Sequence, residues 1–185
     1  YYSEESMTWE VKRPSLEAVK ILDPVVEETS LKSKAVKNYS DSIIDPSFIS
    51  YIIQIESSGN PKAVGSSGER GLMQIMRNTW HDSTTRIYGI PISFDKAFKP
   101  KENIKAGIAQ LEWLEQSYLP QNISNWENLS EKTRRDSIIA AYNIGAFGFL
   151  KNYQGNPYHK NLPQITKNYI SKVNALVYGK KQVAP

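Results

Sequence analysis

Glu56 is the residue whose type and position best suit proton-transfer chemistry. Asp45 and Pro46 predict a helix start, because aspartate can cap a first turn and proline fits the first helical position. Three isoleucines then share one helix face, and Glu56 takes the next position on that stripe. Burial and the negative end of the helix dipole both disfavour a charged carboxylate, so we expect a raised pKa, as in a general acid. The alternative for this helix alone is a carboxylate that reaches solvent past its neighbours.

Four sequence blocks carry a resemblance to a known family. They are Glu-Ser with Asn-Pro at 56–61, Gly-Leu-Met-Gln-Ile-Met at 71–76, Ala-Ala-Tyr-Asn-Ile-Gly at 140–145, and the tyrosine at 169. In these blocks, which together cover about residues 44–178, the sequence resembles the soluble, lysozyme-like lytic transglycosylases. A Gly-rich, polar loop over residues 65–70, just before the second block, is expected to return the chain towards the end of the first helix.

The resemblance implies both a fold and a reaction. The fold is mainly α and lysozyme-like, with little or no β-structure, as a single catalytic domain over residues 44–180. The reaction is cleavage of the β-1,4 bond between N-acetylmuramic acid and N-acetylglucosamine in peptidoglycan. In that family one glutamate protonates the glycosidic oxygen and then acts as a base towards the muramyl 6-hydroxyl, which closes a 1,6-anhydro ring. By this resemblance Glu56 takes both roles, and neither a cofactor nor a metal is expected.

The resemblance assigns substrate contacts to six further side chains, namely Ser57, Met73, Gln74, Tyr142, Asn143 and Tyr169. The serine is expected to fix the helix end, while the methionine and the glutamine line the sugar groove with apolar surface and an amide. The asparagine hydrogen-bonds near the scissile sugar with Tyr142 beside it, and Tyr169 directs its hydroxyl at the acid or the substrate. Core packing is the alternative for Met73 and Tyr142.

The sequence departs from the family pattern in the loop before the second block. Gly65 to Gly68 stand where many members have Ser-Pro, so Ser66 is the candidate for the missing serine contact, and Glu69 replaces a small residue. We hypothesise that Glu69 is a second carboxylate close enough to tune Glu56. Asp82 and Asp95 are further candidates for a second acid.

Two alternative functions follow from these observations. A second acid would suit a hydrolytic muramidase resembling goose-type lysozyme, since hydrolysis normally uses two carboxylates. From another class, the domain could be a non-catalytic glycan-binding or scaffold module of an envelope machine. An idle module would be expected to lose the acid, which this sequence keeps.

Hydrophobic spacing predicts the remaining elements. Further helices are expected over residues 77–88, 101–118, 130–142 and 164–178, separated by loops over residues 89–100, 120–128 and 145–162. Charged residues between 131 and 136 are expected to form a solvated first half of their helix, and residues 138–141 a buried second half. No alternating strand pattern competes with these helices.

Composition sets the outer bounds. The 185 residues include no cysteine and two histidines, which disfavours disulfides, thiol chemistry and a histidine-rich metal site. A net charge of +4 suits an anionic polymer, and its dispersed basic residues disfavour nucleic-acid binding. We expect a monomer exported to the periplasm or cell envelope, present here as a mature or trimmed form without a signal peptide. Residues 1–43 are expected to be an extension or linker, either a flexible lead-in or an arm that packs on the catalytic domain or on a partner, such as an envelope-spanning assembly.

Overall fold

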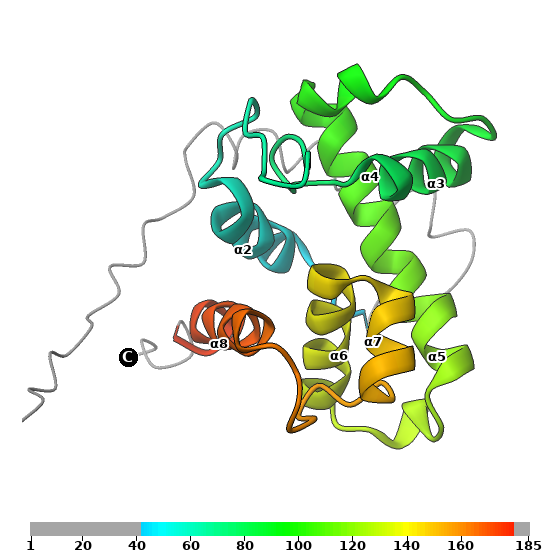
Figure 1. The fold of residues 1–185 in the computed structure, drawn as a ribbon, viewed down its shortest axis with the longest axis vertical. Coiled ribbons are helices and arrows are strands. Elements are labelled where there is room, and N and C mark those ends of the chain that lie inside the picture. Colours follow the sequence, from blue (N-terminus) through cyan, green and yellow to red (C-terminus); the bar gives the residue numbers. More distant parts are fainter. Residues whose placement is uncertain (1–41, 180–185) are drawn as a thin grey trace, which may run out of the picture.

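Helices make up nearly all of the regular structure in residues 42–179, the part of the chain that this computed structural model describes (Figure 1). The α-helices are α2 (Pro46–Ser57), α3 (Arg77–Tyr88), α4 (Pro100–Trp113), α5 (Leu119–Asn122), α6 (Glu131–Ile144), α7 (Ala146–Tyr153) and α8 (Gln164–Gly179). The same residues also contain two 3₁₀ turns, η2 (Phe94–Phe98) and η4 (Trp126–Asn128), and a π-helical segment, η3 (Leu114–Tyr118). The expected mainly α fold is confirmed. The extension predicted over residues 1–43 lies, except for its last two residues, outside the described residues.

Helix α2 begins as the sequence predicts. The Asp45 side chain accepts a hydrogen bond from the Phe48 amide at 2.7 Å, and Pro46 occupies the first turn. The helix ends at Ser57, and Ser58 takes the left-handed cap conformation with φ of 53°. Glu56 therefore stands in the last turn of α2, as expected.

Helix α4 ends at Trp113, but the helical run continues through η3 and α5 beyond the predicted helix end at residue 118. Its apolar stripe is fully buried at Ile104, Leu111 and Leu114, and the chain then runs through η3 into α5, which ends at Asn122. The prediction of a loop from Pro120 was wrong for residues 120–122, which belong to α5. Pro120 falls in the first turn of this helix, where a missing N–H is tolerated. Within the predicted loop 89–100, η2 forms a short turn.

The charged first half of α6 is solvated only at its start, which corrects the sequence prediction: Glu131 and Lys132 are exposed, but the charged residues that end this half are buried. Arg135 is 7% exposed and Asp136 is fully buried. The Asp136 carboxylate accepts hydrogen bonds from Lys132 at 2.6 Å, Tyr158 at 2.7 Å and Asn174 at 2.8 Å. Partners from α8 and from the loop before it therefore compensate the burial of this charge. The buried second half, Ile138 to Ala141, is confirmed.

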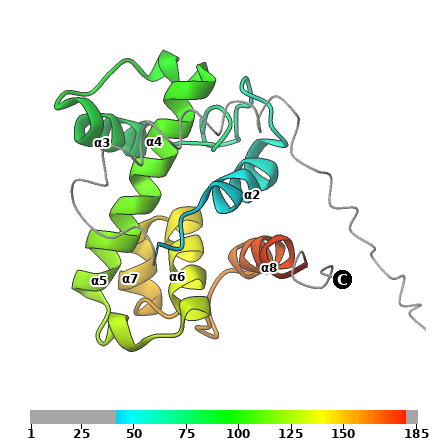
Figure 2. The ribbon, with the colours of Figure 1, turned by 180° about the vertical axis from the view of Figure 1, so that it is seen from behind.

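The helices form two groups around α6. In both views α2 and α8 lie on one side of α6, and α4 with α3 lies on the other (Figures 1 and 2). Helix α7 packs against α6 and occupies part of a segment that the sequence predicted as a loop. Its apolar residues supply the reason, since Phe149 is fully buried. No helix in the described part of the chain is long and apolar enough to cross a membrane.

The segment between α2 and α3 returns to α2, as predicted. Isolated β-bridges pair Val64 with Arg70 and Arg70 with Ile75, so the segment forms a small β-like excursion, for which there was little basis in the sequence. The Ser57 hydroxyl donates a hydrogen bond to the Leu72 carbonyl at 2.7 Å, which joins the end of α2 to the returning chain.

Candidate active site

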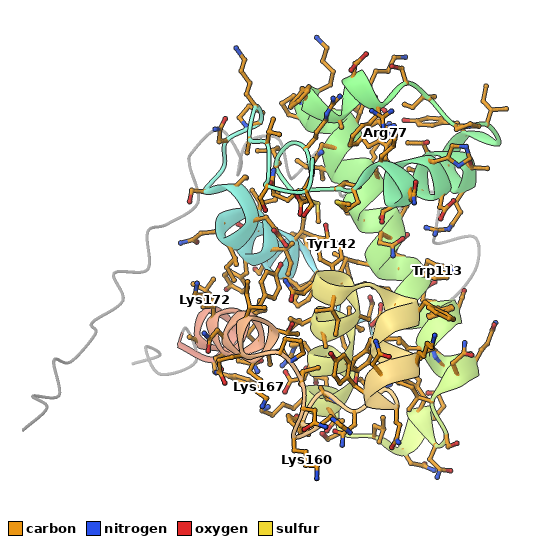
Figure 3. The ribbon with its side chains drawn as sticks, viewed as in Figure 1. Arg77, Trp113, Tyr142, Lys160, Lys167 and Lys172 are labelled. Atoms are coloured by element: carbon orange, nitrogen blue, oxygen red, sulfur yellow. The ribbon has the colours of Figure 1, made fainter. Side chains whose placement is uncertain are left out.

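A pocket of about 240 Å³ opens where the end of α2, the returning loop and the end of α6 meet. It is lined by Glu56, Gly65, Ser66, Glu69, Gln74, Met76, Tyr142 and Asn143. An adjoining hollow shares Gln74, Met76 and Tyr142 with it and extends towards α4 and α7. Tyr142 lies near the centre of the molecule at the end of α6 (Figure 3). The structure thus brings the first three sequence blocks together at one groove.

Glu56 meets the requirements of a general acid. The Tyr169 hydroxyl, from α8, donates a hydrogen bond to Oε1 of Glu56 at 2.6 Å. The pKa of Glu56 is raised to about 7, chiefly because burial disfavours the carboxylate, and the charge of Glu69 raises it further, while the Tyr169 hydrogen bond lowers it. Burial, and then the charge of Glu56, raise the pKa of Tyr169 well above its ordinary value, so its hydroxyl stays protonated and donates.

The turn at residues 71–74 is held by a side chain that sequence analysis missed. Asn103 of α4 is fully buried; its Oδ1 accepts from the Met73 amide at 2.8 Å, and its Nδ2 donates to the carbonyls of Arg70 at 2.9 Å and Ala97 at 2.8 Å. Gly71 has φ of 77°, and a Cβ there would overlap Asn103 and the Ala97 carbonyl. The signal in the sequence that could have identified this residue was its position, since the polar Asn103 lies directly beside the apolar stripe of α4.

Met73 does not line the groove with its side chain, so that expectation was wrong. Its side chain is fully buried and fills the space left by Gly107, where a Cβ would overlap its sulfur atom. The core-packing alternative is the correct one for this residue. Its carbonyl accepts a hydrogen bond from the Tyr142 hydroxyl at 2.8 Å, which fixes the half-buried Tyr142 ring in the pocket wall.

Two amide side chains line the pocket from different elements, Gln74 from the segment before α3 and Asn143 from α6. The amide nitrogen of Gln74 donates to the carbonyls of Gly71 at 2.8 Å and Ala63 at 3.2 Å. The amide oxygen of Asn143 accepts from the Thr166 hydroxyl of α8 at 2.8 Å. Both amides could be identified from the sequence, but not the threonine that holds the second one.

Among the three candidates for a second carboxylate, Glu69 alone lines the pocket. Its Oε2 accepts a hydrogen bond from the Ser67 amide at 2.9 Å, in space left open by the absent side chain of Gly65. Asp95 is 88% exposed at its side chain and pairs with Arg70, and the exposed Asp82 is near His81. Within residues 42–179, no group of three histidine, cysteine or carboxylate side chains could hold a metal ion.

Fold and site together describe a helical, lysozyme-like domain whose pocket holds a partly buried acid that can donate a proton. The sequence model of the Transglycosylase SLT domain family matches residues 33–165. The chain belongs to this family.

The curated relatives are longer than this chain. It is similar to the membrane-bound lytic murein transglycosylase C of Photorhabdus laumondii subsp. laumondii, with 38% identity over 115 residues that cover 61% of this chain and 30% of the relative. The protein of the same name from Pectobacterium atrosepticum is 36% identical over 129 residues, covering 68% and 33% of the two chains. The chain thus spans about a third of the length of these relatives.

A solved structure has the same fold. The lytic transglycosylase Slt of Pseudomonas aeruginosa, solved by X-ray as an inactive glutamate-to-glutamine mutant, superimposes with a TM-score of 0.59 and 24% identity. The match covers 90% of this chain and 24% of the Slt chain. The lysozyme-like fold expected from the sequence is confirmed by this likeness.

Proposed function

We propose that this chain is a peptidoglycan lytic transglycosylase that cleaves the β-1,4 bond between N-acetylmuramic acid and N-acetylglucosamine. The observation that carries the proposal is Glu56, a pocket carboxylate with a pKa of about 7 that is hydrogen-bonded to Tyr169. Such an acid is protonated in a large fraction of molecules near neutral pH. Membership of the SLT family and the names of the relatives support the choice of glycan.

The proposed mechanism uses Glu56 twice. Protonated Glu56 gives its proton to the glycosidic oxygen as the bond from that oxygen to the muramyl C1 breaks, and the N-acetylglucosamine end leaves as an alcohol. The resulting carboxylate then takes the proton of the muramyl 6-hydroxyl while the oxygen of that hydroxyl bonds to C1, which closes the 1,6-anhydro ring. The acid is regenerated, and water is not consumed. Burial supports both roles, because a pKa of about 7 lets Glu56 hold a proton near neutral pH for the first step and makes its carboxylate a stronger base than an ordinary one for the second.

The other proposed contacts rest on the pocket lining. Gln74, Tyr142 and Asn143 bind the sugars, and Tyr169 keeps the acid in position through its hydrogen bond. Ser57 acts indirectly, because it joins the end of α2 to the Leu72 carbonyl. Ser66, which also lines the pocket, is the proposed replacement for the missing family serine.

A hydrolytic muramidase is the second candidate, because Glu69 shares the pocket with Glu56. In that mechanism Glu69 would activate a water molecule. Asp82 and Asp95 are dropped as candidates, since neither lines the pocket.

Mass spectrometry of products released from purified peptidoglycan distinguishes the candidates. Fragments ending in 1,6-anhydromuramic acid, lost with Glu56→Gln, are the expected result. Reducing muramic ends that are heavier by one water would contradict the proposal and favour hydrolysis. Absence of product from both forms, together with retained glycan binding, would favour the non-catalytic module.

We also propose that Glu69 tunes Glu56. The Glu69 charge raises the pKa of Glu56, so Glu69→Gln is expected to move the alkaline limb of the pH–rate profile to lower pH. Glu127→Gln is a matched control, because that carboxylate is 83% exposed at its side chain and does not line the pocket. An unchanged rate and pH profile in Glu69→Gln would show that the proposal is wrong.

The proposed location is the cell envelope, on the exported side where peptidoglycan lies. It rests on the proposed substrate and on the relatives, which are named membrane-bound. Docking of an envelope assembly by the N-terminal extension stays a proposal about residues outside the described range.

A further inference from the structure

Helix α8 reaches the site through two side chains, of which only one contacts the acid. Thr166 and Tyr169 are three residues apart and therefore share a face of α8. Tyr169 contacts Glu56 from α2, and Thr166 contacts Asn143 from α6. Thr166 is fully buried and is not part of the pocket lining, so it acts on the pocket only through Asn143.

The hydrogen bonds fix which end of each pocket amide remains available. Both hydrogens of the Gln74 amide are directed to carbonyl oxygens, so the Gln74 oxygen is left as an acceptor. Asn143 is held in the opposite sense, because its oxygen accepts from Thr166 and its NH₂ group donates to no atom in residues 42–179. One wall of the pocket therefore offers an acceptor and the other a donor.

We propose that Thr166 is a positioning residue that orients the Asn143 amide, so that its NH₂ group binds an acceptor oxygen of the sugar opposite the Gln74 oxygen. An acetamido group or a pair of hydroxyls on an N-acetylated sugar supplies the complementary set, one donor for Gln74 and one acceptor for Asn143. The proposal rests on the proposed function for the identity of the glycan. It adds a residue that sets the direction in which the sugar binds.

Three variants distinguish the orienting role of the Thr166 hydroxyl from the packing of its side chain. Thr166→Val keeps the shape of the side chain but removes its hydroxyl, so the Asn143 amide loses the partner that holds its oxygen. Thr166→Ser keeps the hydroxyl. Asn143→Asp keeps an acceptor for Thr166 but offers no donor to the sugar.

Binding is measured first, in the Glu56→Gln background, by titration calorimetry with a tetrasaccharide of alternating N-acetylglucosamine and N-acetylmuramic acid. We expect Thr166→Val to weaken the affinity about tenfold, since a hydrogen bond contributes about 1 kcal/mol and a misoriented amide costs more. Thr166→Ser should keep most of the affinity, and Asn143→Asp should weaken it at least as much as Thr166→Val does. The matched control is Thr84→Val, which removes the hydroxyl of another buried threonine, bonded within α3 to the Trp80 carbonyl.

A double-mutant cycle then tests whether Thr166 acts through Asn143. In an Asn143→Ala background, Thr166→Val should have no further effect on affinity. An equal loss in both backgrounds, or native affinity in Asn143→Asp, would overturn the proposal. If the unmutated chain releases no anhydro product, the proposed function fails, whereas the binding cycle in the Glu56→Gln chain still decides the role of Thr166.

Discussion

Replacing the buried acid should stabilise this protein, by an amount that depends on pH. The pKa of Glu56 rises from an ordinary value of 4.5 to about 7 on folding. Between these values the folded protein holds a proton that the unfolded chain has released, so stability falls as pH rises through this window. At 1.36 kcal/mol for each pKa unit, the loss amounts to about 3 kcal/mol above pH 7.

Glu56→Gln removes this dependence, because the amide stays neutral and keeps an acceptor for the Tyr169 hydroxyl. We expect the two proteins to have similar free energies of unfolding near pH 4 and the variant to be more stable by about 3 kcal/mol near pH 9. Urea denaturation across this range measures the difference directly. The exposed Glu127→Gln is the control and should give no comparable change with pH.

A difference between the two proteins that stays constant with pH would refute the reasoning. It would mean that Glu56 ionises in the folded protein as it does in the unfolded chain. The first mechanistic step would then lack its protonated acid near neutral pH.

Two further predictions concern the residues that hold the site. Tyr169→Phe removes a hydrogen bond that lowers the pKa of Glu56, so the alkaline limb of the pH profile of kcat/KM should move to higher pH. The value of kcat should also fall about tenfold, because the acid loses the group that positions it. An alkaline limb at the same pH as in the unmutated protein would contradict this prediction. Asn103→Ala leaves the Met73 amide and two carbonyls without their buried partner, so the free energy of unfolding in urea should fall by about 3 kcal/mol. A loss below about 1 kcal/mol would show that the turn does not depend on Asn103.

Local signals predicted the parts of the fold that depend on neighbouring residues. The caps at Asp45 and Ser130 mark helix starts because each side chain accepts a hydrogen bond from an amide three residues later. The stripe that placed Glu56 beside buried isoleucines needed only the helical period. The acid could therefore be found, and the direction of its pKa shift argued, before the fold was known.

The surroundings of three side chains could not be predicted from the sequence, because they depend on contacts with residues far away along the chain. Asp136 looks like a solvated charge until Tyr158 and Asn174 arrive from later in the chain. Met73 could be assigned to the core only once Gly107 of α4 was seen to leave space for it. Thr166 looked like an ordinary helix residue, because nothing in the sequence shows that it meets Asn143.

The contact between Tyr169 and Glu56 spans 113 residues of chain and joins the described domain's first helix to its last. Closing so long a loop carries a large entropic cost, which other long-range packing must offset before the contact becomes stable. In a partly folded chain, Glu56 therefore lacks its hydrogen bond from Tyr169, even when α2 is fully formed. In a refolding experiment, the return of activity would report completion of the whole domain, and a chain cut before α8 would have an acid without its partner.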